Sequence, residues 1–370
     1  MTLQPAVAPA IAASRPAADQ SRLRLMIVDD SAIARAVLSR MVSSQSDLEV
    51  VALAANVQEA LSALQRARFD IVLLDVEMPG ISGLDAIPEI LKRGRGARVI
   101  VVSSMADEGA EAAVRALALG AADTLPKPGA GNFGGRFAEV LCERLRRIGP
   151  SGQGSSTVAA APVEPLSFTL RAAPDVRLGC LALGASTGGL HALTEFLREL
   201  PQRISSPILI TQHLPPVFMP YFARQIEAVS GRPAEVARDG AVLTPEHILV
   251  APGDGHLGLE QVGNCVHVRL TTAPASSGCM PSVDTMLWSV SEVYGRAGMA
   301  VIFSGMGRDG LVGSARIVDG GGVVLVQNEQ SSAVWGMPRA VAEAGLASAV
   351  LAPAELARRV GARAGAQCWK

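Results

Sequence analysis

The chain has 370 residues, 49% hydrophobic and 18% charged, with a formal net charge of −1. The apolar content supports folded cores rather than disorder, and the length suits two domains, since single cores rarely grow beyond about 250–300 residues. A near-neutral charge without a dense run of Lys and Arg argues against a nucleic-acid partner.

Nothing in the chain predicts a disulfide framework, a zinc motif or a membrane segment. The five cysteines are scattered and form no C-x-x-C pair, and no run of about 18 apolar residues appears. Residues 1–21 are rich in Ala and Pro and lack the pattern of a signal peptide, so they are interpreted as a disordered extension. We expect a protein that is not inserted in a membrane and that resides in a reducing cytoplasm.

Residues 22–148 alternate short β-type runs with amphipathic segments. The β-type runs include LRLMIV, LEVVALA, FDIVLL and RVIVVSS, and the segments between them have helical periodicity. This alternation is typical of βαβ units around a parallel sheet. We therefore predict a doubly wound, flavodoxin-like α/β domain.

Polar residues follow the strands of this first domain. Asp29 and Asp30 follow LMIV, Asp75 follows IVLL, Ser103 follows VIVV, and Lys127 follows the last strand. Carboxylates brought together at one sheet edge repel one another unless a cation such as Mg²⁺ neutralises them. The set predicts a phosphoryl acceptor in which Asp75 is the nucleophile, Mg²⁺ and Lys127 offset charge, and Ser103 holds phosphoryl oxygens.

The motifs around these residues are more specific than the residues themselves. Singly, paired Asp residues are ordinary helix caps, but DVEMPGISGLD begins at Asp75 and Lys127 is the middle residue of PKP. Residues 22–148 therefore resemble the response-regulator receiver family. The resemblance implies phosphorylation of Asp75. Related receivers often carry an aromatic switch residue three positions before the lysine, and Thr124 stands there.

A second α/β alternation follows a change in composition. Residues 149–174 are rich in Ser, Gly, Ala and Pro and are interpreted as a flexible linker. From residue 175 to residue 370, apolar runs such as LGCLALG, SPILITQHL, GMAVIFSG and GGVVLVQN alternate with helical segments. We predict a second doubly wound parallel-sheet domain, Rossmann-like, over residues 175–370.

The second domain contains a candidate nucleophile. Ser186 lies in GASTGG, between a predicted strand and a predicted helix. Small neighbours allow a sharp turn that exposes the hydroxyl at the helix N-terminus, as in a nucleophile elbow. The pattern alone is weak, because such a turn also suits phosphate binding or a simple tight connection.

A base and an orienting carboxylate come from later strands. His213 ends the next apolar strand in ILITQHL, and Asp309 follows the strand AVIF in SGMGRDG. Parallel strands would bring Ser186, His213 and Asp309 to one edge. The other histidines lie in a helix or in less suitable positions: His191, His247, His256 and His267. The order Ser, His, Asp differs from the Ser, Asp, His order of common α/β-hydrolases.

The motifs of the second domain occur in a specific order. GASTGG, QHLPP, VAPGDGH, MPSVDTML, SGMGRDG and QNEQSSAVWGMPRAV follow one another as in the chemotaxis methylesterase (CheB) family, which the chain resembles. The resemblance implies Ser186 as nucleophile, His213 as general base and acid, and Asp309 as its orienting partner. It also implies an oxyanion role for the Met306 amide and a polar contact from Thr187 to the histidine.

The resemblance further implies a phosphorylation-activated protein-glutamate methylesterase. Its substrates would be methylated chemoreceptors, its phosphodonor a chemotaxis histidine kinase, and its receiver cofactor Mg²⁺, with no cofactor in the catalytic domain. Deamidation of receptor glutamine would use the same residues. Two alternatives stay open: a catalytically silent, receiver-linked docking protein, and an esterase of a chemosensory pathway other than motility. A DNA-binding output would need a basic helix-turn-helix, which the second half lacks.

Overall fold

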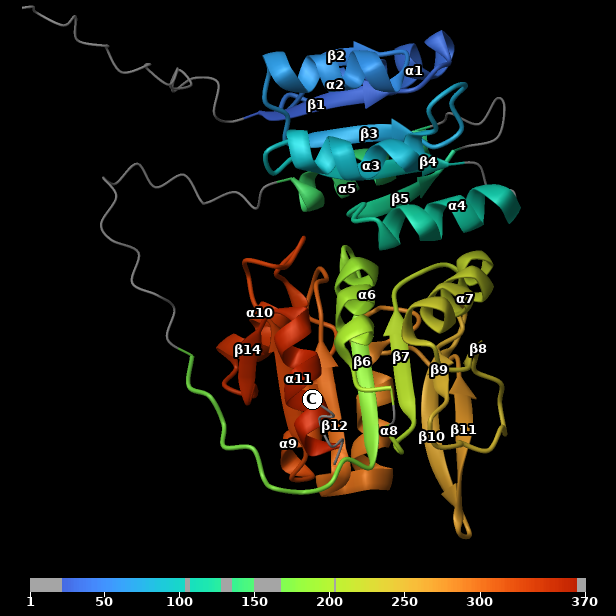
Figure 1. The fold of residues 1–370 in the computed structure, drawn as a ribbon, viewed down its shortest axis with the longest axis vertical. Helices are drawn as coiled ribbons and strands as arrows, with labels where there is room; N and C mark the ends of the chain where they lie inside the picture. The colour runs from blue at the N-terminus through green and yellow to red at the C-terminus, as the bar shows by residue number, and fades with distance from the viewer. Residues whose placement is uncertain (1–21, 104–106, 128–134, 150–167, 203, 365–370) are drawn as a thin grey trace, which may run out of the picture.

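The computed structural model describes residues 22–103, 107–127, 135–149, 168–202 and 204–364. The chain forms two α/β domains, and the N-terminal one sits against one end of the C-terminal one (Figure 1). The predicted extension and most of the predicted linker lie outside the described residues. None of the described helices combines the length and apolarity that a membrane crossing requires.

The N-terminal domain is a five-stranded parallel sheet in the order β2-β1-β3-β4-β5. Its elements are β1 (Leu23–Val28), α1 (Ala32–Ser43), β2 (Leu48–Ala54), α2 (Val57–Arg66), β3 (Ile71–Asp75), α3 (Gly83–Arg93), β4 (Arg98–Ser103), α4 (Asp107–Ala118), β5 (Asp123–Pro126) and α5 (Gly135–Ile148).

Alternate strand residues of this sheet point to opposite faces. Leu25 and Ile27 pack with α1 and α5 on one face, whereas Met26 and Val28 pack with α2, α3 and α4 on the other. The strands are buried on both faces and therefore read as continuous apolar runs. This explains why LRLMIV and FDIVLL show no strand periodicity.

The C-terminal domain is a seven-stranded parallel sheet in the order β14-β13-β12-β6-β7-β9-β8. Its elements are β6 (Cys180–Ala185), α6 (Gly189–Glu199), β7 (Ile208–Gln212), η2 (Pro216–Phe218), α7 (Met219–Ser230), β8 (Ala234–Val236), β9 (Ile248–Val250), β10 (His256–Val262), β11 (Cys265–Thr271), α8 (Val283–Tyr294), η3 (Gly295–Ala297), β12 (Gly298–Ile302), α9 (Leu311–Asp319), β13 (Val323–Gln327), α10 (Met337–Glu343), β14 (Ala349–Leu351) and α11 (Pro353–Arg363).

The strand order reverses between β6 and β12. From β6 the chain builds outward to β7 and its neighbours, and from β12 it builds the other way to β13 and β14. The crevice beyond the carboxyl ends of the strands at such a reversal is the usual ligand site of an open α/β sheet. Helix α6 is held over this point, since the rings of Phe196 and Phe303 pack edge to face at 5.2 Å.

The structure confirms two parallel-sheet α/β domains and adds a feature that the sequence did not predict. Strands β10 and β11 pair as an antiparallel hairpin outside the main sheet. Leu257, Leu259 and Val268 of this hairpin pack into the core formed with α8. The hairpin therefore anchors the loop between β11 and α8, which reaches the candidate site.

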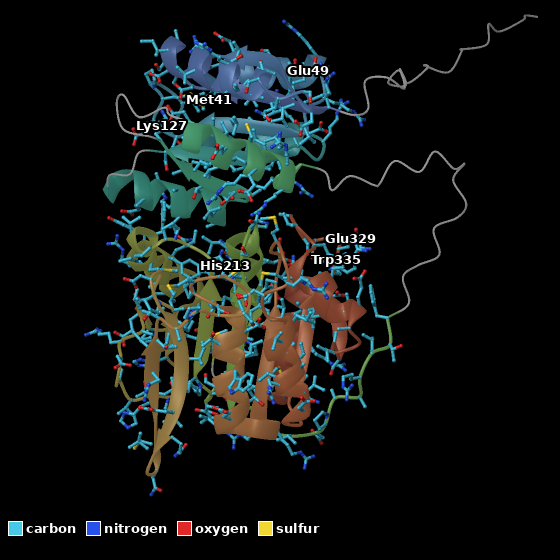
Figure 2. All side chains as sticks on the ribbon, turned by 180° about the vertical axis from the view of Figure 1, so that it is seen from behind. Met41, Glu49, Lys127, His213, Glu329 and Trp335 are labelled. Atoms are coloured by element: carbon cyan, nitrogen blue, oxygen red, sulfur yellow. The ribbon has the colours of Figure 1, made fainter. Side chains whose placement is uncertain are left out.

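The two domains meet through α4, which packs against α6, α7 and η2 (Figure 1). The Gly188 amide donates a hydrogen bond to the Ala122 carbonyl at 2.8 Å, and the Arg224 and Glu111 side chains form an ion pair at 3.7 Å. Exposed ion pairs contribute about 0–1 kcal/mol, so the contact depends mainly on packing. Figure 2 shows His213 on the side of the C-terminal domain that faces the N-terminal domain.

Candidate active site

Ser186 lies on the sharp turn between β6 and α6. Its amide donates to the Ser304 carbonyl at 3.0 Å, and its own carbonyl accepts from Gln212 Nε2 at 2.8 Å. The turn requires Gly188, whose φ is +71° and whose added Cβ would lie 2.3 Å from the Ala333 Cβ. The backbone is therefore fixed from three sides while the Ser186 hydroxyl stays in the pocket.

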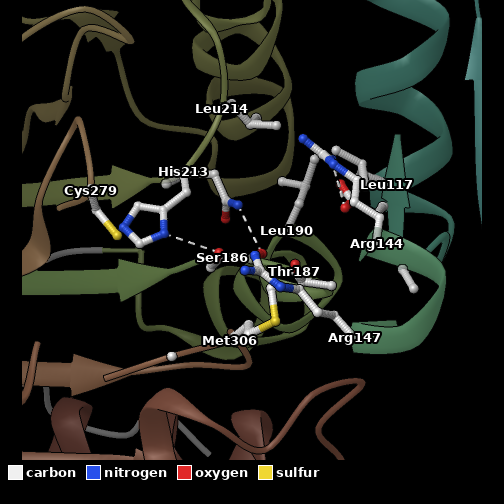
Figure 3. Close-up of a pocket in the computed structure, with 14 residues that line it drawn as sticks. Leu117, Arg144, Arg147, Ser186, Thr187, Leu190, His213, Leu214, Cys279 and Met306 are labelled. Atoms are coloured by element: carbon white, nitrogen blue, oxygen red, sulfur yellow. Dashed lines mark hydrogen bonds and ion pairs between the residues drawn. The ribbon is translucent and has the colours of Figure 1, made fainter. Parts of the chain in front are cut away.

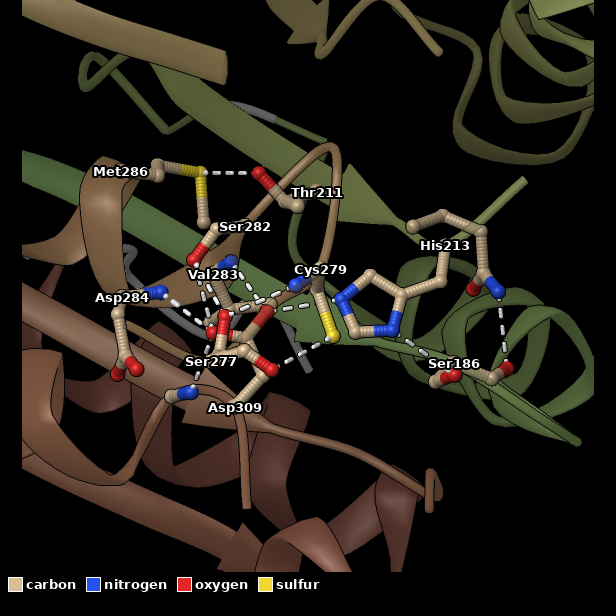
Figure 4. A network of polar contacts seen from close by, with 12 residues as sticks. Ser186, Thr211, His213, Ser277, Cys279, Ser282, Val283, Asp284, Met286 and Asp309 are labelled. Carbon is tan, nitrogen blue, oxygen red and sulfur yellow. Dashed lines mark hydrogen bonds and ion pairs between the residues drawn. The ribbon is translucent and has the colours of Figure 1, made fainter. Parts of the chain in front are cut away.

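The predicted serine, histidine and aspartate lie in line. His213 Nδ1 is 3.0 Å from Ser186 Oγ, and His213 Nε2 is 2.8 Å from Asp309 Oδ2 (Figure 4). An ionised carboxylate only accepts, so the neutral imidazole donates from Nε2 and keeps an acceptor lone pair on Nδ1. This tautomer is the one that can take the proton of Ser186.

Asp309 is buried, with 1% of its side chain exposed. Oδ2 accepts from the Val283 amide at 2.7 Å, and Oδ1 accepts from Ser282 Oγ at 2.9 Å and from the Asp284 and Gly310 amides, each at 3.1 Å. Burial alone raises the pKa of Asp309, but its bonds with His213 and with these amides outweigh burial and hold the pKa well below its usual range. Asp309 is therefore a fixed negative charge behind the imidazole.

The His213 imidazole is stabilised in its charged form. Burial lowers its pKa, but the adjacent Asp309 carboxylate and Cys279 sulfur act against burial and raise the pKa to about 9. Only 17% of the side chain is exposed, so solvent screens these interactions weakly. The imidazolium that forms when Ser186 gives up its proton is thus stabilised.

A pocket of about 400 Å³ opens in front of this group. Both domains line it: Ser186 and His213 on one side, and Leu117, Arg144 and Arg147 on the other (Figure 3). Arg144 is tied to its own domain by an ion pair with Asp123 at 2.7 Å. The N-terminal domain therefore forms one wall of the pocket around Ser186.

The predicted phosphoryl-acceptor residues come together in the N-terminal domain. The carboxylates of Asp29, Asp30 and Asp75 lie within 4.8 Å of one another. Lys127 Nζ is 2.6 Å from Asp75 Oδ2 and 3.3 Å from Asp29 Oδ2. Burial raises the pKa of Asp75, and the charge of Asp29 adds to this, against the opposing effect of Lys127. A divalent cation would relieve this repulsion.

Ser103 supports the same site. Its hydroxyl is buried and has no hydrogen-bond partner among the described residues. A buried hydroxyl without a partner is costly unless a ligand supplies one. Three clustered carboxylates and an unpartnered hydroxyl fit a metal ion together with a phosphoryl group.

At the position of the aromatic switch, Thr124 is buried and its carbonyl accepts a hydrogen bond from Arg144 at 3.0 Å.

Comparisons with known proteins agree with this two-domain arrangement. The model of the response regulator receiver domain family matches residues 25–132, and the CheB methylesterase model matches residues 181–360. A protein-glutamate methylesterase/protein-glutamine glutaminase of Azospirillum brasilense is 37% identical over 358 residues, which cover 90% of this chain and 91% of that protein. The chain belongs to the CheB methylesterase family.

A second CheB-family member matches to a similar extent, and a solved catalytic domain covers half of this chain. Protein-glutamate methylesterase/protein-glutamine glutaminase 1 of Paramagnetospirillum magneticum is 38% identical over 372 residues, 94% of this chain and 97% of that protein. The crystal structure of the Thermotoga maritima CheB methylesterase catalytic domain is 32% identical, covers 50% of this chain and 99% of that one, and has a TM-score of 0.49.

Two residues of the CheB-family motifs lie near Ser186 as expected, although their roles stay predictions. Met306 and Thr187 both line the pocket. The Met306 amide donates no hydrogen bond within the part of the chain that the structure describes, so it is free to meet an oxyanion. Thr187 has no hydrogen bond to His213 among the described residues, and instead its carbonyl accepts from Ser304 Oγ at 2.8 Å.

Sequence reasoning missed a layer of residues behind Asp309. His256 is fully buried, and its Nδ1 accepts from the Ser282 amide at 2.9 Å while its Nε2 donates to the Ala273 carbonyl at 2.9 Å. The Ser282 hydroxyl in turn bonds to Asp309. Both residues lie in the CheB-family motifs VAPGDGH and MPSVDTML, but no local pattern indicates that these motifs meet.

Proposed function

We propose that this chain is a protein-glutamate methylesterase that hydrolyses glutamyl methyl esters on chemoreceptors and deamidates receptor glutamines. The observation that supports it most is the line of hydrogen bonds from Ser186 through His213 to Asp309. In this proposal Ser186 is the nucleophile, His213 the general base and acid, and Asp309 the orienting carboxylate. These are the parts of a serine-hydrolase site.

The chemistry has two halves. His213 Nδ1 accepts the proton of Ser186 Oγ as the oxygen attacks the ester carbonyl, and the Met306 amide stabilises the oxyanion, a contact worth about 10²–10³ in rate in comparable enzymes. His213 then gives this proton to the leaving methoxide oxygen, which departs as methanol, or to the leaving amide nitrogen of a glutamine substrate, which departs as ammonia. Water, activated by the same nitrogen, releases the glutamate carboxylate from acyl-Ser186.

The receiver regulates this site by covering it. Leu117, Arg144 and Arg147 form the receiver side of the pocket, and the bond between the Gly188 amide and the Ala122 carbonyl ties the receiver to the turn that carries Ser186. A chemotaxis histidine kinase donates a phosphoryl group to Asp75. Because Arg144 is bonded to Asp123 and Thr124, a shift of β5 would move this wall of the pocket.

Asp29, Asp30 and Asp75 would hold Mg²⁺ at the phosphorylation site. The ion supplies charge neutralisation for the transferring phosphoryl group. Lys127 contributes a second positive charge next to Asp75, and the Ser103 hydroxyl gains a phosphoryl oxygen as its partner. Phosphorylation thus changes the hydrogen bonding of the ends of β3, β4 and β5 together.

The test is methanol release from membranes that carry methylated receptors. Wild type is compared with Ser186→Ala and Asp75→Asn, each with and without a small-molecule phosphodonor. We expect release to be abolished in Ser186→Ala, and to lose its response to phosphodonor in Asp75→Asn. Wild type that releases no methanol under either condition would instead indicate a docking protein or another substrate, such as that of a non-motility chemosensory pathway.

A further inference from the structure

A cysteine stands beside the imidazole of the proposed triad. Cys279 lies on the loop between β11 and α8 and lines the pocket, and Figure 4 shows its sulfur facing the His213 ring. Ligand atoms of His213, Cys279 and Asp309 all lie within 4.8 Å of one another. The proposed hydrolysis uses His213 and Asp309 but gives the Cys279 thiol no part. The thiol therefore needs a separate account.

This group combines the nitrogen, sulfur and oxygen donors that Zn²⁺ prefers. Zinc binds imidazole nitrogen and carboxylate oxygen at about 2.0–2.2 Å and thiolate sulfur at about 2.3 Å, usually in a tetrahedron. Donors around one such ion are separated by about 3–4 Å, so three atoms already within 4.8 Å need only a small movement. His213 and Cys279 both line the pocket, so a water molecule from the pocket would supply the fourth ligand.

We propose that His213 Nε2, Cys279 Sγ and the Asp309 carboxylate form an inhibitory binding site for a thiophilic divalent cation such as Zn²⁺. The surroundings suit this occupant. Asp309 Oδ1 keeps its bonds from Ser282, Asp284 and Gly310, so the carboxylate keeps its orientation. Oδ2 would then bind the metal in place of the imidazole proton. Second-layer hydrogen bonds of this kind raise metal affinity.

Coordination at Nε2 disables the base. In the metal-free site the single proton of the neutral imidazole is on Nε2, and the Nδ1 lone pair faces Ser186 Oγ. When the metal takes the Nε2 lone pair, the ring proton moves through solvent to Nδ1, and the thiol releases its proton to solvent. His213 then carries a hydrogen toward Ser186 and cannot accept one. The metal is thus an inhibitor and not a cofactor.

Metal binding depends only on the three side chains, whereas loss of hydrolysis also rests on the proposed function. The tests are therefore separated. Binding is measured by absorption, in a variant that cannot turn over, and inhibition is measured by methanol release.

The binding test uses Co²⁺ as a spectroscopic substitute for Zn²⁺ in the full-length Ser186→Ala protein. A thiolate bound to Co²⁺ gives a sulfur-to-metal charge-transfer band, whereas Co²⁺ on the receiver carboxylates gives none. We expect the band in Ser186→Ala, its loss in Ser186→Ala with Cys279→Ser, and its retention in Ser186→Ala with Cys265→Ser, a matched change at an exposed cysteine of β11. A band that persists without Cys279, or no band at all, would overturn the proposal.

The inhibition test compares Zn²⁺ titrations of wild type, Cys279→Ser and Cys265→Ser. Each rate is expressed relative to the same protein treated with chelator, so differences in basal rate do not matter. We expect Cys279→Ser to need at least about 10-fold more Zn²⁺ than wild type, since loss of even a second-layer partner can cost that much. Cys265→Ser should follow wild type. Equal sensitivity of all three proteins would contradict the proposal.

If wild type, Cys279→Ser and Cys265→Ser all fail to release methanol, the proposed function fails. The charge-transfer band of the Co²⁺ protein still decides in that case whether the metal site exists. A band together with hydrolysis that Zn²⁺ leaves unchanged would retain the site but refute its inhibitory effect.

Discussion

The Ser282 hydroxyl donates a hydrogen bond to Asp309 Oδ1 at 2.9 Å, while the Ser282 amide donates to His256. The position of the carboxylate behind His213 therefore depends on a loop that is held in turn by the β10–β11 hairpin. We expect Ser282→Ala to lower kcat by about 10-fold with a smaller change in KM, since a hydrogen bond to a charged group is worth about 1.5–3 kcal/mol. Steady-state methanol release measures this.

The matched control for this change is Ser289→Ala. Ser289 is a buried serine of α8, the helix that begins directly after Ser282, and its hydroxyl bonds only to the Met286 carbonyl among the described residues. Its loss should leave kcat within about twofold of wild type, as expected away from the reacting groups. A Ser282→Ala protein as active as Ser289→Ala would show that the backbone amides alone orient Asp309.

The rate should depend on pH through His213. The neutral imidazole accepts the Ser186 proton, so with a pKa of about 9 the active fraction is small at pH 7 and rises as the pH approaches 9. A pH profile of kcat/KM, recorded with chelator and corrected with Ser186→Ala for uncatalysed hydrolysis, checks this. In Cys279→Ser the midpoint should move down, because the sulfur contributes to the shift. A profile already flat above pH 6.5 would refute the prediction.

The turn at Gly188 should not tolerate a side chain. Gly188→Ala puts a methyl group 2.3 Å from the Ala333 Cβ at a φ of +71°, so we expect both a lower melting temperature and a loss of methanol release. Gly231→Ala is the control, since Gly231 has a φ of +66° but its nearest neighbour lies at 3.6 Å. It should lose about 1 kcal/mol of stability and keep its activity. Equal loss of activity in both would remove the steric explanation.

Removal of divalent cations should uncouple the two domains. The carboxylates of Asp29, Asp30 and Asp75 repel without a cation, so EDTA should prevent the response to phosphodonor while the basal rate does not fall. Methanol release with and without phosphodonor, before and after Mg²⁺ is restored, measures this. Stimulation that survives EDTA would argue against a metal-assisted phosphorylation of Asp75.

The sequence predicted those features that are local or repeated along the chain. Apolar runs followed by Asp75, Ser186, His213 and Asp309 indicated parallel strands with polar carboxyl ends, and the structure brings the last three together. The β10–β11 hairpin was not predicted, because the alternation of apolar runs and helical segments in this domain indicated parallel strands only.

Contacts between distant loops were beyond such reasoning. Cys279 reads as an isolated cysteine with no metal-ligand spacing, and only the folded chain sets it against His213 and Asp309. Ser282 and His256 likewise meet only because the hairpin packs on α8. The placement of α4 over α6 and α7 is not encoded in any pattern within either domain.

The reversal of strand order between β6 and β12 has a consequence for folding. His213 and Asp309 are 96 residues apart and lie on opposite sides of that reversal. Neither half of the sheet alone therefore contains the complete set of Ser186, His213 and Asp309. Contacts so distant in sequence form late and slowly in folding. Ester hydrolysis during refolding should therefore appear only when the two halves join, which makes enzymatic turnover a probe of the final step of assembly.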